Sequence, residues 1–356
     1  MKFLVQELLN NNKFKEIAES IKNETSPIAI SGLSDVSKVN VIASILESTK
    51  RKICVLTYNE IQAKKLVKDL KYFFKKVYFF PKREIAPYDY IAESKDLPYE
   101  RIAVLNKIKL QEKSREPIIV VTTIEAVMQK MISKEELYEN IVDFKIGETY
   151  RVEDLKKTFV KLGYERTNLI EGQGQFSIRG GIVDVGLSNS VGVRIEFWGD
   201  EVDSIRYFKI DSQRSTEMIQ NITIFPAHEF ITQDVSKAIN KIEENYSNAE
   251  EDIELIKNGE VISKIDKYFN EFYENYKEQY KIIKHQRDIA RKDQVVSLEK
   301  YRLKQNSMQV GFITNLKKIL EAGEDKALLI SATGERGIFV TGGRNLGFTR
   351  ASEAWS

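Results

Sequence analysis

The segment Gly32–Val39 has the spacing of a loop that holds nucleotide phosphates, with two changes that remove its chemistry. A working loop reads G-x-x-x-x-G-K-[ST], because the second glycine lets backbone N–H groups wrap the phosphates and the hydroxyl coordinates magnesium. Gly32 and Lys38 are present, but Ser37 stands at the second glycine and Val39 at the hydroxyl position. Valine cannot ligate a metal ion, and a side chain at Ser37 disfavours a tight anion-binding turn. We therefore expect a degenerate phosphate loop that neither hydrolyses nucleotides nor holds a cofactor.

Other residues that could perform chemistry are few. Cys54 is the only cysteine and lies in the apolar run Ile53–Leu56, where a buried structural thiol is expected rather than a nucleophile. His228 and His285 are the only histidines, so a zinc site is not expected. No acidic motif of the D-E-x-x kind follows an apolar strand. The sequence therefore predicts no catalytic residues.

A second set of candidates comes from the alternating segments 175–179 and 193–198. Successive side chains of a strand point to opposite faces of the sheet. The apolar residues of both segments therefore share one face, and Arg179, Arg194 and Trp198 share the other. Arg and Trp are the residues most enriched among interface hot spots, so this second face is a candidate protein-binding surface.

The same alternation allows a purely structural interpretation of this face. Trp198 could shield a neighbouring strand, and the arginines could pair with Glu196 and Glu201 at the surface. Such exposed pairs each contribute at most about 1 kcal/mol to stability. The alternation by itself does not choose between this interpretation and a binding surface.

Helix and strand patterns divide the chain into four segments that must position these candidates. The first alternates helices with continuous Ile/Val runs, which indicates an α/β domain with a parallel sheet covered on both faces. The second has short alternating strands and glycine turns, typical of a small mixed α+β, mainly antiparallel domain. The third is helical and is expected to pack on the first, and the fourth lacks periodicity and is expected to be poorly ordered. The predicted boundaries are 1–130, 131–228, 229–333 and 334–356.

Composition limits the other classes of protein and partner. A length of 356 residues, with 42% hydrophobic residues, allows two or three domains. No apolar run approaches the roughly 20 residues of a membrane span, and the N-terminus lacks a secretory signal. We therefore expect a cytoplasmic protein with no membrane partner. The net charge of +2 is too small to indicate general nucleic-acid affinity.

Two stretches of the third segment leave alternatives open. Aromatic residues from Tyr268 to Tyr280 recur at three- and four-residue spacing, which favours a packing face over a platform for stacking bases. The stretch Lys281–Lys304 is rich in Lys, Arg and Gln. A solvated helix face is expected there, with direct DNA binding through phosphate contacts as the alternative.

Several motifs between residues 80 and 230 occur together and give a more specific indication. They include F-P-K-R-E-I-A-P-Y-D-Y, E-R-I-A-V-L, R-G-G-I-V-D-V and R-I-E-F-W-G-D-E-V-D-S-I-R. In combination they resemble the UvrB-like N-terminal module of bacterial transcription-repair coupling factors. The motifs lie at 80–90, 100–105, 120–126, 174–185, 193–206, 211–215 and 224–230.

The coupling factor is the closer of the two UvrB-like relatives. UvrB has an intact phosphate loop and an aromatic-rich hairpin after its Y-D-Y element. This chain passes from Tyr88-Asp89-Tyr90 to the helix of Glu100 and Arg101 within a dozen residues. It resembles the coupling factor's module, in which ATP binding is lost.

This resemblance implies partners and contact residues. It implies that the second segment binds UvrA through Arg179, Arg194, Trp198 and Arg206, and that a full-length parent contacts RNA polymerase and double-stranded DNA. Asp184-Val185-Gly186-Leu187 replaces the family's usual D-I-F-P, which is expected to alter the following turn. The alternative is a nucleotide-hydrolysing or DNA-binding UvrB-like repair protein.

Overall fold

The computed structural model describes most of the chain and separates it into two compact units. Unit 1 comprises residues 1–83, 103–131 and 278–356, and unit 2 comprises 84–102 and 132–277. No helix in the described part of the chain is both long and apolar enough to cross a membrane. The described residues are 2–23, 28–83, 97–112, 116–129, 131–132, 134–227, 229, 235–257, 268, 327–332 and 337–341.

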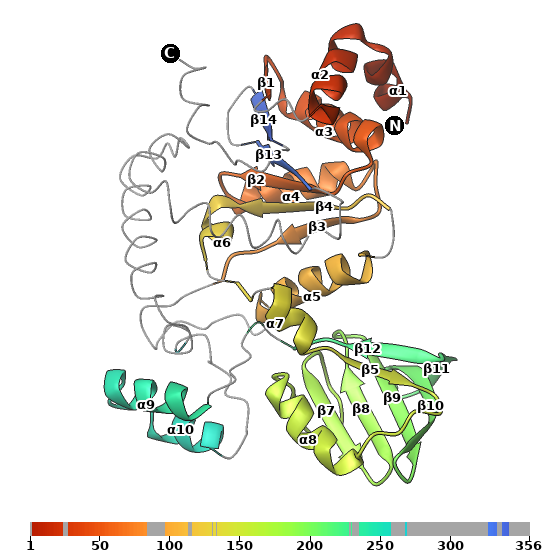
Figure 1. Cartoon of the computed structure of the whole chain (residues 1–356), viewed down its shortest axis with the longest axis vertical. Helices are drawn as coiled ribbons and strands as arrows, with labels where there is room; N and C mark the ends of the chain where they lie inside the picture. The colour runs from red at the N-terminus through yellow and green to blue at the C-terminus, as the bar shows by residue number, and fades with distance from the viewer. Residues whose placement is uncertain are drawn as a thin grey trace. The chain divides into compact units, whose positions relative to one another are not determined.

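Unit 1 is built on a six-stranded sheet with the strand order β1-β14-β13-β2-β4-β3 (Figure 1). Neighbouring strands pair in parallel from β13 through β2 and β4 to β3, and only β14 pairs antiparallel with both of its neighbours. The central strands are continuous Ile/Val runs buried on both faces, as expected for a covered parallel sheet. The bounds are β1 (Ile28–Ser31), β2 (Ile53–Thr57), β3 (Val77–Phe80), β4 (Ile119–Thr123), β13 (Leu328–Ser331) and β14 (Gly337–Thr341).

Four helices of unit 1, α2, α3, α4 and α6, begin at side-chain caps. Asn11, Ser34, Asn59 and Thr123 each accept a hydrogen bond from a backbone N–H of the following helix. Residues of α2, α3 and α4 share one core cluster with the strands. The bounds are α1 (Lys2–Asn10), α2 (Asn12–Lys22), α3 (Asp35–Thr49), α4 (Glu60–Leu70) and α6 (Ile124–Met128).

The C-terminal part of unit 1 differs from the sequence prediction. Residues 328–331, predicted to be helical, form the buried strand β13, and residues 337–341, predicted to lie in a poorly ordered tail, form β14. The apolar run Ala327–Ala332 is too short for periodicity to separate a buried strand from a helix. Strand β14 was not predicted because glycines and arginines surround its short apolar run, so the segment as a whole shows no strand periodicity. Most of the predicted helical segment, including Lys281–Lys304, lies outside the described residues.

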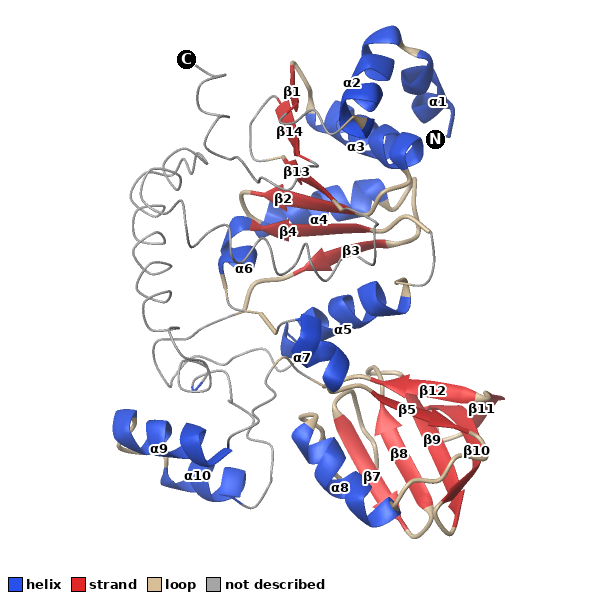
Figure 2. Ribbon diagram, viewed as in Figure 1, coloured by secondary structure: helices blue, strands red, loops and turns tan. Residues whose placement is uncertain are grey.

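Unit 2 contains a second six-stranded sheet, drawn in red beside α8 in Figure 2, with the order β11-β10-β9-β8-β7-β6. All of its neighbouring strands pair antiparallel except β6 with β7. Gly199, with a φ of 64°, and Asp200 form the two-residue turn between β9 and β10. The bounds are β6 (Glu165–Arg166), β7 (Gln175–Arg179), β8 (Ile182–Gly186), β9 (Val191–Trp198), β10 (Glu201–Lys209) and β11 (Ser215–Met218).

One face of the second sheet, its inner face, packs on α8 (Val152–Lys161) and on a two-stranded sheet of β5 (Val142–Lys145) and β12 (Asn221–Ile224). Phe159 of α8 stacks on Phe176 of β7 with ring centroids 5.2 Å apart. Phe144 of β5 contacts Phe159 and Phe197 in the same cluster. Aromatic side chains of this size dominate the energetics of a small core.

A buried ion pair joins distant segments of unit 2. Arg101, in the first turns of α5 (Leu97–Leu110), donates from Nε to Glu229 Oε1 at 2.5 Å. Glu229 also accepts the backbone N–H of Ile132 at 3.4 Å. Both charged side chains are at most 2% exposed. The pair therefore connects two sequence motifs that are 128 residues apart.

The other helices of unit 2 are α7 (Lys134–Glu139), α9 (Val235–Asn245) and α10 (Glu250–Lys257).

We predict that Arg101→Met destabilises the protein by about 3–5 kcal/mol, because it leaves the Glu229 carboxylate buried without its cation. Denaturant unfolding measures this change. Lys145→Met is a matched control, since Lys145 and Glu148 form an exposed pair whose loss should cost at most about 1 kcal/mol. Equal losses of stability in the two variants would contradict a structural role for the buried pair.

Candidate protein-binding surface

The outer face of the second sheet, opposite α8, carries the arginines and the tryptophan that the alternation predicts. Val193 and Ile195 of β9 are buried in the core, whereas Arg194 and Trp198 alternate with them toward the outer face. Arg179 of β7 lies on the same face. We define the arginine face as Arg179, Asp184, Arg194, Glu196, Trp198, Ser204 and Arg206.

Strand register brings two of these arginines to one carboxylate. Asp184 of β8 lies directly opposite Arg194 of β9. Its Oδ1 accepts from Arg194 Nε at 2.7 Å, and its Oδ2 accepts from Arg194 Nη2 at 2.9 Å. Oδ2 also accepts from Arg179 Nη2 at 2.7 Å. Asp184 is 1% exposed, so this is a two-point guanidinium–carboxylate contact largely shielded from water.

Arg206 occupies the neighbouring position on β10, opposite Arg194. It donates from Nη2 to Glu196 and, at 3.1 Å, to the hydroxyl of Ser204. The Ser204 hydroxyl in turn donates to Glu196 Oε2 at 2.8 Å. The side chains of Arg206 and Glu196 are only partly buried, so this ion pair remains partly exposed to solvent.

The ring of Phe208 packs against the guanidinium group of Arg194. Its ring is fully buried, and the Arg194 guanidinium carbon lies 5.0 Å from the ring centroid. This cation–π contact fixes the plane of the guanidinium. Phe208 can lie flat on the sheet because its cross-strand neighbour is Gly192, where an added Cβ would come within 2.4 Å of the ring. The glycine therefore makes room for the aromatic ring under the arginine.

Two large apolar side chains are exposed at the margins of this surface. Trp198, at the end of β9, is 86% exposed, and Met218 of β11 is 66% exposed. Trp198 therefore does not shield a neighbouring strand in this structure. Met218 lies directly opposite Arg206 across the strand pair. Exposed aromatic and Met side chains beside arginines have the composition of an interface core.

The structure corrects the predicted surface pairing of the arginines. Asp184 pairs with both Arg179 and Arg194, while Glu196 pairs with Arg206. Sequence reasoning missed Asp184 and Met218. Alternation along β8 could have placed Asp184 on the outer face, but the sequence does not give the register that aligns it with Arg194. The role of the predicted contact residues in binding stays a prediction.

The segment Gly32–Val39, predicted to be a degenerate phosphate loop, forms the capped start of α3. Gly32 has a φ of 76°, and the Ser34 hydroxyl accepts the backbone N–H of Ser37 at 3.2 Å. Lys38 is buried, and Val39 belongs to the apolar core. The residue at the magnesium position therefore contributes to packing instead of facing a ligand.

The carboxylate of Asp35, in the first turn of α3, pairs with Lys38 of the same helix and with Lys65 of α4. Asp35 Oδ2 lies 3.0 Å from Lys65 Nζ, and Asp35 Oδ1 lies 3.7 Å from Lys38 Nζ. The hydrogen bond from Lys65 and the charge of Lys38 hold the Asp35 pKa below its usual value. Asp35 therefore neutralises part of the positive charge of the two lysines, which weakens their attraction for a phosphate.

Two further predictions concern Cys54 and metal binding, and the two histidines, His228 and His285, lie outside the described residues. Cys54 is buried as predicted, and burial raises the pKa of its thiol to about 12, so it stays protonated at neutral pH. Among the described residues, no group of three or more His, Cys, Asp and Glu side chains could hold a metal ion. Tyr268 packs edge-on against Tyr246 with centroids 5.0 Å apart, which supports the packing interpretation at that one position. The other aromatic residues of that stretch lie outside the described residues.

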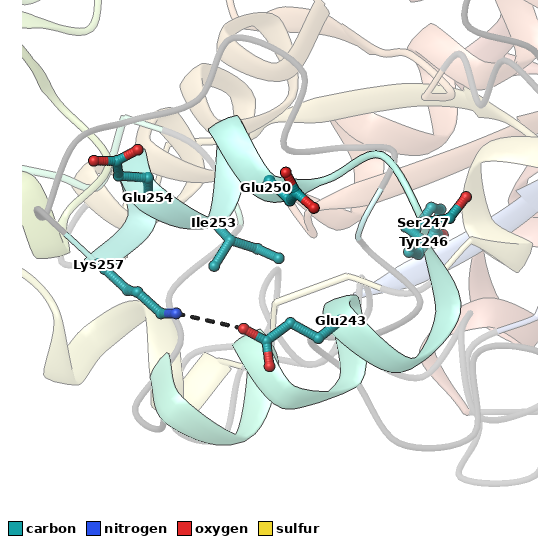
Figure 3. Close-up of a pocket in the computed structure, with 7 residues that line it drawn as sticks. All are labelled: Glu243, Tyr246, Ser247, Glu250, Ile253, Glu254 and Lys257. Atoms are coloured by element: carbon teal, nitrogen blue, oxygen red, sulfur yellow. Dashed lines mark hydrogen bonds and ion pairs between the residues drawn. The ribbon is translucent and has the colours of Figure 1, made fainter.

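A separate pocket of about 540 Å³ lies between α9 and α10 (Figure 3). Ile253 points between the two helices, and Lys257 reaches across to Glu243 with 3.4 Å between Nζ and Oε1. Glu250 and Glu254 also line the pocket. Its net negative lining makes it unsuitable for a nucleotide phosphate.

Comparison with known proteins finds a family model that matches the part of the chain containing the second sheet. Residues 142–230 match the UvrB interaction domain. This range contains α8, the second sheet, the two-stranded sheet and the whole arginine face.

The chain is also similar to curated proteins named transcription-repair-coupling factor. It is 28% identical to that of Bacillus subtilis over 287 residues, which is 74% of this chain and 24% of the relative. It is 28% identical to that of Staphylococcus haemolyticus over 238 residues, covering 66% and 20% of the two chains. The matched region therefore spans about a quarter or less of these relatives. These matches confirm the resemblance that the motifs indicate.

We predict that Gly192→Ala destabilises the protein by about 1–3 kcal/mol, because the new methyl group would overlap the Phe208 ring in a packed position. Thermal unfolding of the purified variant measures the change. Gly172→Ala is the matched control, since its Cβ would meet only Asn189 Oδ1 at an ordinary 3.6 Å. A Gly192 variant as stable as this control would show that the ring is not confined.

Proposed function

We propose that this chain is a docking module of transcription-coupled nucleotide-excision repair that binds UvrA through the arginine face. The observation that carries the proposal is the position of this face inside the range that matches the UvrB interaction domain. The names of the similar proteins, transcription-repair-coupling factors, support the repair context. In a longer parent protein the module would act beside segments that contact RNA polymerase and double-stranded DNA.

The physical character of the arginine face supports protein recognition. Its three guanidinium groups face two carboxylates, which leaves one positive charge in excess. Arg179 remains about half exposed and Trp198 is almost fully exposed, so both are accessible to a partner. An acidic partner surface with an apolar side chain would complement this arrangement.

We further propose that the chain has no ATPase activity of its own. Three features support this part of the proposal: the internal carboxylate of Asp35, the side chain at Ser37 and the packing of Val39 into the core. A phosphate requires free backbone N–H groups at a helix start, and here the Ser34 hydroxyl already accepts the N–H of Ser37. The nucleotide-hydrolysing alternative therefore has little support from the geometry of the loop.

We predict that Arg179→Glu weakens UvrA binding by at least about 2 kcal/mol, or roughly thirtyfold in Kd, because a central arginine is replaced by a repelling charge. Titration of purified UvrA by surface plasmon resonance measures this effect. Arg166→Glu is the matched control, because Arg166 is an exposed arginine on the edge strand β6. Both variants should keep the circular dichroism spectrum of the unchanged protein. Undiminished binding by Arg179→Glu would refute the assignment of this face.

We also predict that isothermal titration of the chain with magnesium-ATP shows no binding at micromolar concentrations. The expected reason is the missing metal-ligating hydroxyl at Val39 and the negative charge of Asp35 beside Lys38. A nucleotide-hydrolysing protein with an intact loop serves as the positive control. Micromolar binding in this titration would overturn the interpretation of Ser37 and Val39.

A further inference from the structure

We propose that Asp184 is the positioning residue of the arginine face, fixing Arg179 and Arg194 before a partner arrives. This inference rests on the proposed function, because it concerns the same surface. Asp184 itself is 1% exposed and cannot make an extensive contact with a partner. Its effect on binding would therefore act through the two arginines that it holds.

The hydrogen-bond geometry decides which donors remain available. A guanidinium group has five N–H donors in a rigid plane. Arg194 uses Nε and Nη2 on Asp184, and Arg179 uses Nη2 on the same carboxylate. The remaining donors of both arginines are directed away from Asp184. A partner carboxylate can then bind them without displacing the internal one.

Support from two sides makes the orientation of Arg194 well defined. Asp184 holds the edge of the guanidinium through two hydrogen bonds, while the buried ring of Phe208 lies against its face. A free arginine side chain loses rotamer entropy when a partner orders it. Here that ordering has already occurred on folding. Preorganisation of this kind raises affinity mainly by slowing dissociation.

A simpler role for Asp184 would be to neutralise charge. The two roles predict opposite effects when the carboxylate is removed. If Asp184 only lowered the positive charge, its loss would strengthen the attraction of an acidic partner and speed association. If Asp184 positions the arginines, its loss would speed dissociation and weaken binding, although the surface becomes more positive.

The test is Asp184→Asn in the full chain, with UvrA binding followed by surface plasmon resonance. We expect Kd to rise about tenfold, mostly through faster dissociation, with an association rate that is unchanged or higher. Asp154→Asn is the matched control, since it removes the same charge from α8, on the opposite side of the sheet. Binding by Asp184→Asn that equals or exceeds that of the control would overturn the proposal.

A double-mutant cycle tests whether Asp184 acts through Arg194. In the Arg194→Ala background, Asp184→Asn should change Kd by clearly less than tenfold, because one of its two cations is already gone. Strictly additive effects would contradict the positioning role. Circular dichroism and thermal unfolding of each variant establish that it is folded at the binding temperature.

A second variant keeps the proposal testable if Asp184→Asn does not fold. Asp184→Glu preserves the charge but moves the carboxylate by one methylene, so positioning predicts weaker binding and charge neutralisation predicts no change.

The proposed function is tested separately by the unchanged protein and by Arg179→Glu. If the unchanged chain does not bind UvrA, the proposed function fails. If it binds, Arg179→Glu loses binding and both Asp184 variants bind normally, only the positioning role fails.

Discussion

The shared carboxylate of Asp184 is the interaction on which the arginine face depends. A carboxylate this deeply buried would be strongly unfavourable without cations, and two arginines would diverge without a common acceptor. Asp184 and Arg194 are ten residues apart but meet only when β8 and β9 pair in the correct register. Formation of the sheet and assembly of the candidate surface are therefore one event. The glycine at 192 belongs to the same event, because it admits the ring that lies against Arg194.

The two units use an internal carboxylate with opposite consequences. In unit 1, Asp35 at the start of α3 pairs with Lys38 of the same helix and with Lys65 of α4. An ammonium group is a compact point charge, so its pairing with Asp35 reduces its attraction for an anionic ligand. In unit 2, Asp184 pairs with arginines, whose planar groups keep further donors after one edge is engaged. An ion pair of the same kind therefore engages the compact charge of a lysine in unit 1 and one edge of a planar guanidinium group in unit 2.

The sequence predicted those features that depend on local periodicity. Alternation placed Arg179, Arg194 and Trp198 on one face, and the buried Ile/Val runs identified β2 and β4. Features that depend on pairing between distant segments were missed. Arg101 and Glu229 were seen only as parts of separate motifs, and their buried pair joins positions 128 residues apart. Strands β13 and β14 were missed for a related reason. A short apolar run in the sequence does not identify the strand with which it pairs.

The chemistry of the arginine face explains why recognition suits it better than catalysis. Proton transfer requires a group that changes its protonation state near neutral pH. A guanidinium group is not a group of that kind, and the hydrogen bond that Arg194 donates to Asp184 raises the pKa of Arg194. The carboxylates accept hydrogen bonds from arginines and from Ser204, so their oxygens are already engaged. What remains is a set of oriented donors beside exposed apolar side chains, an arrangement suited to contact with a complementary surface.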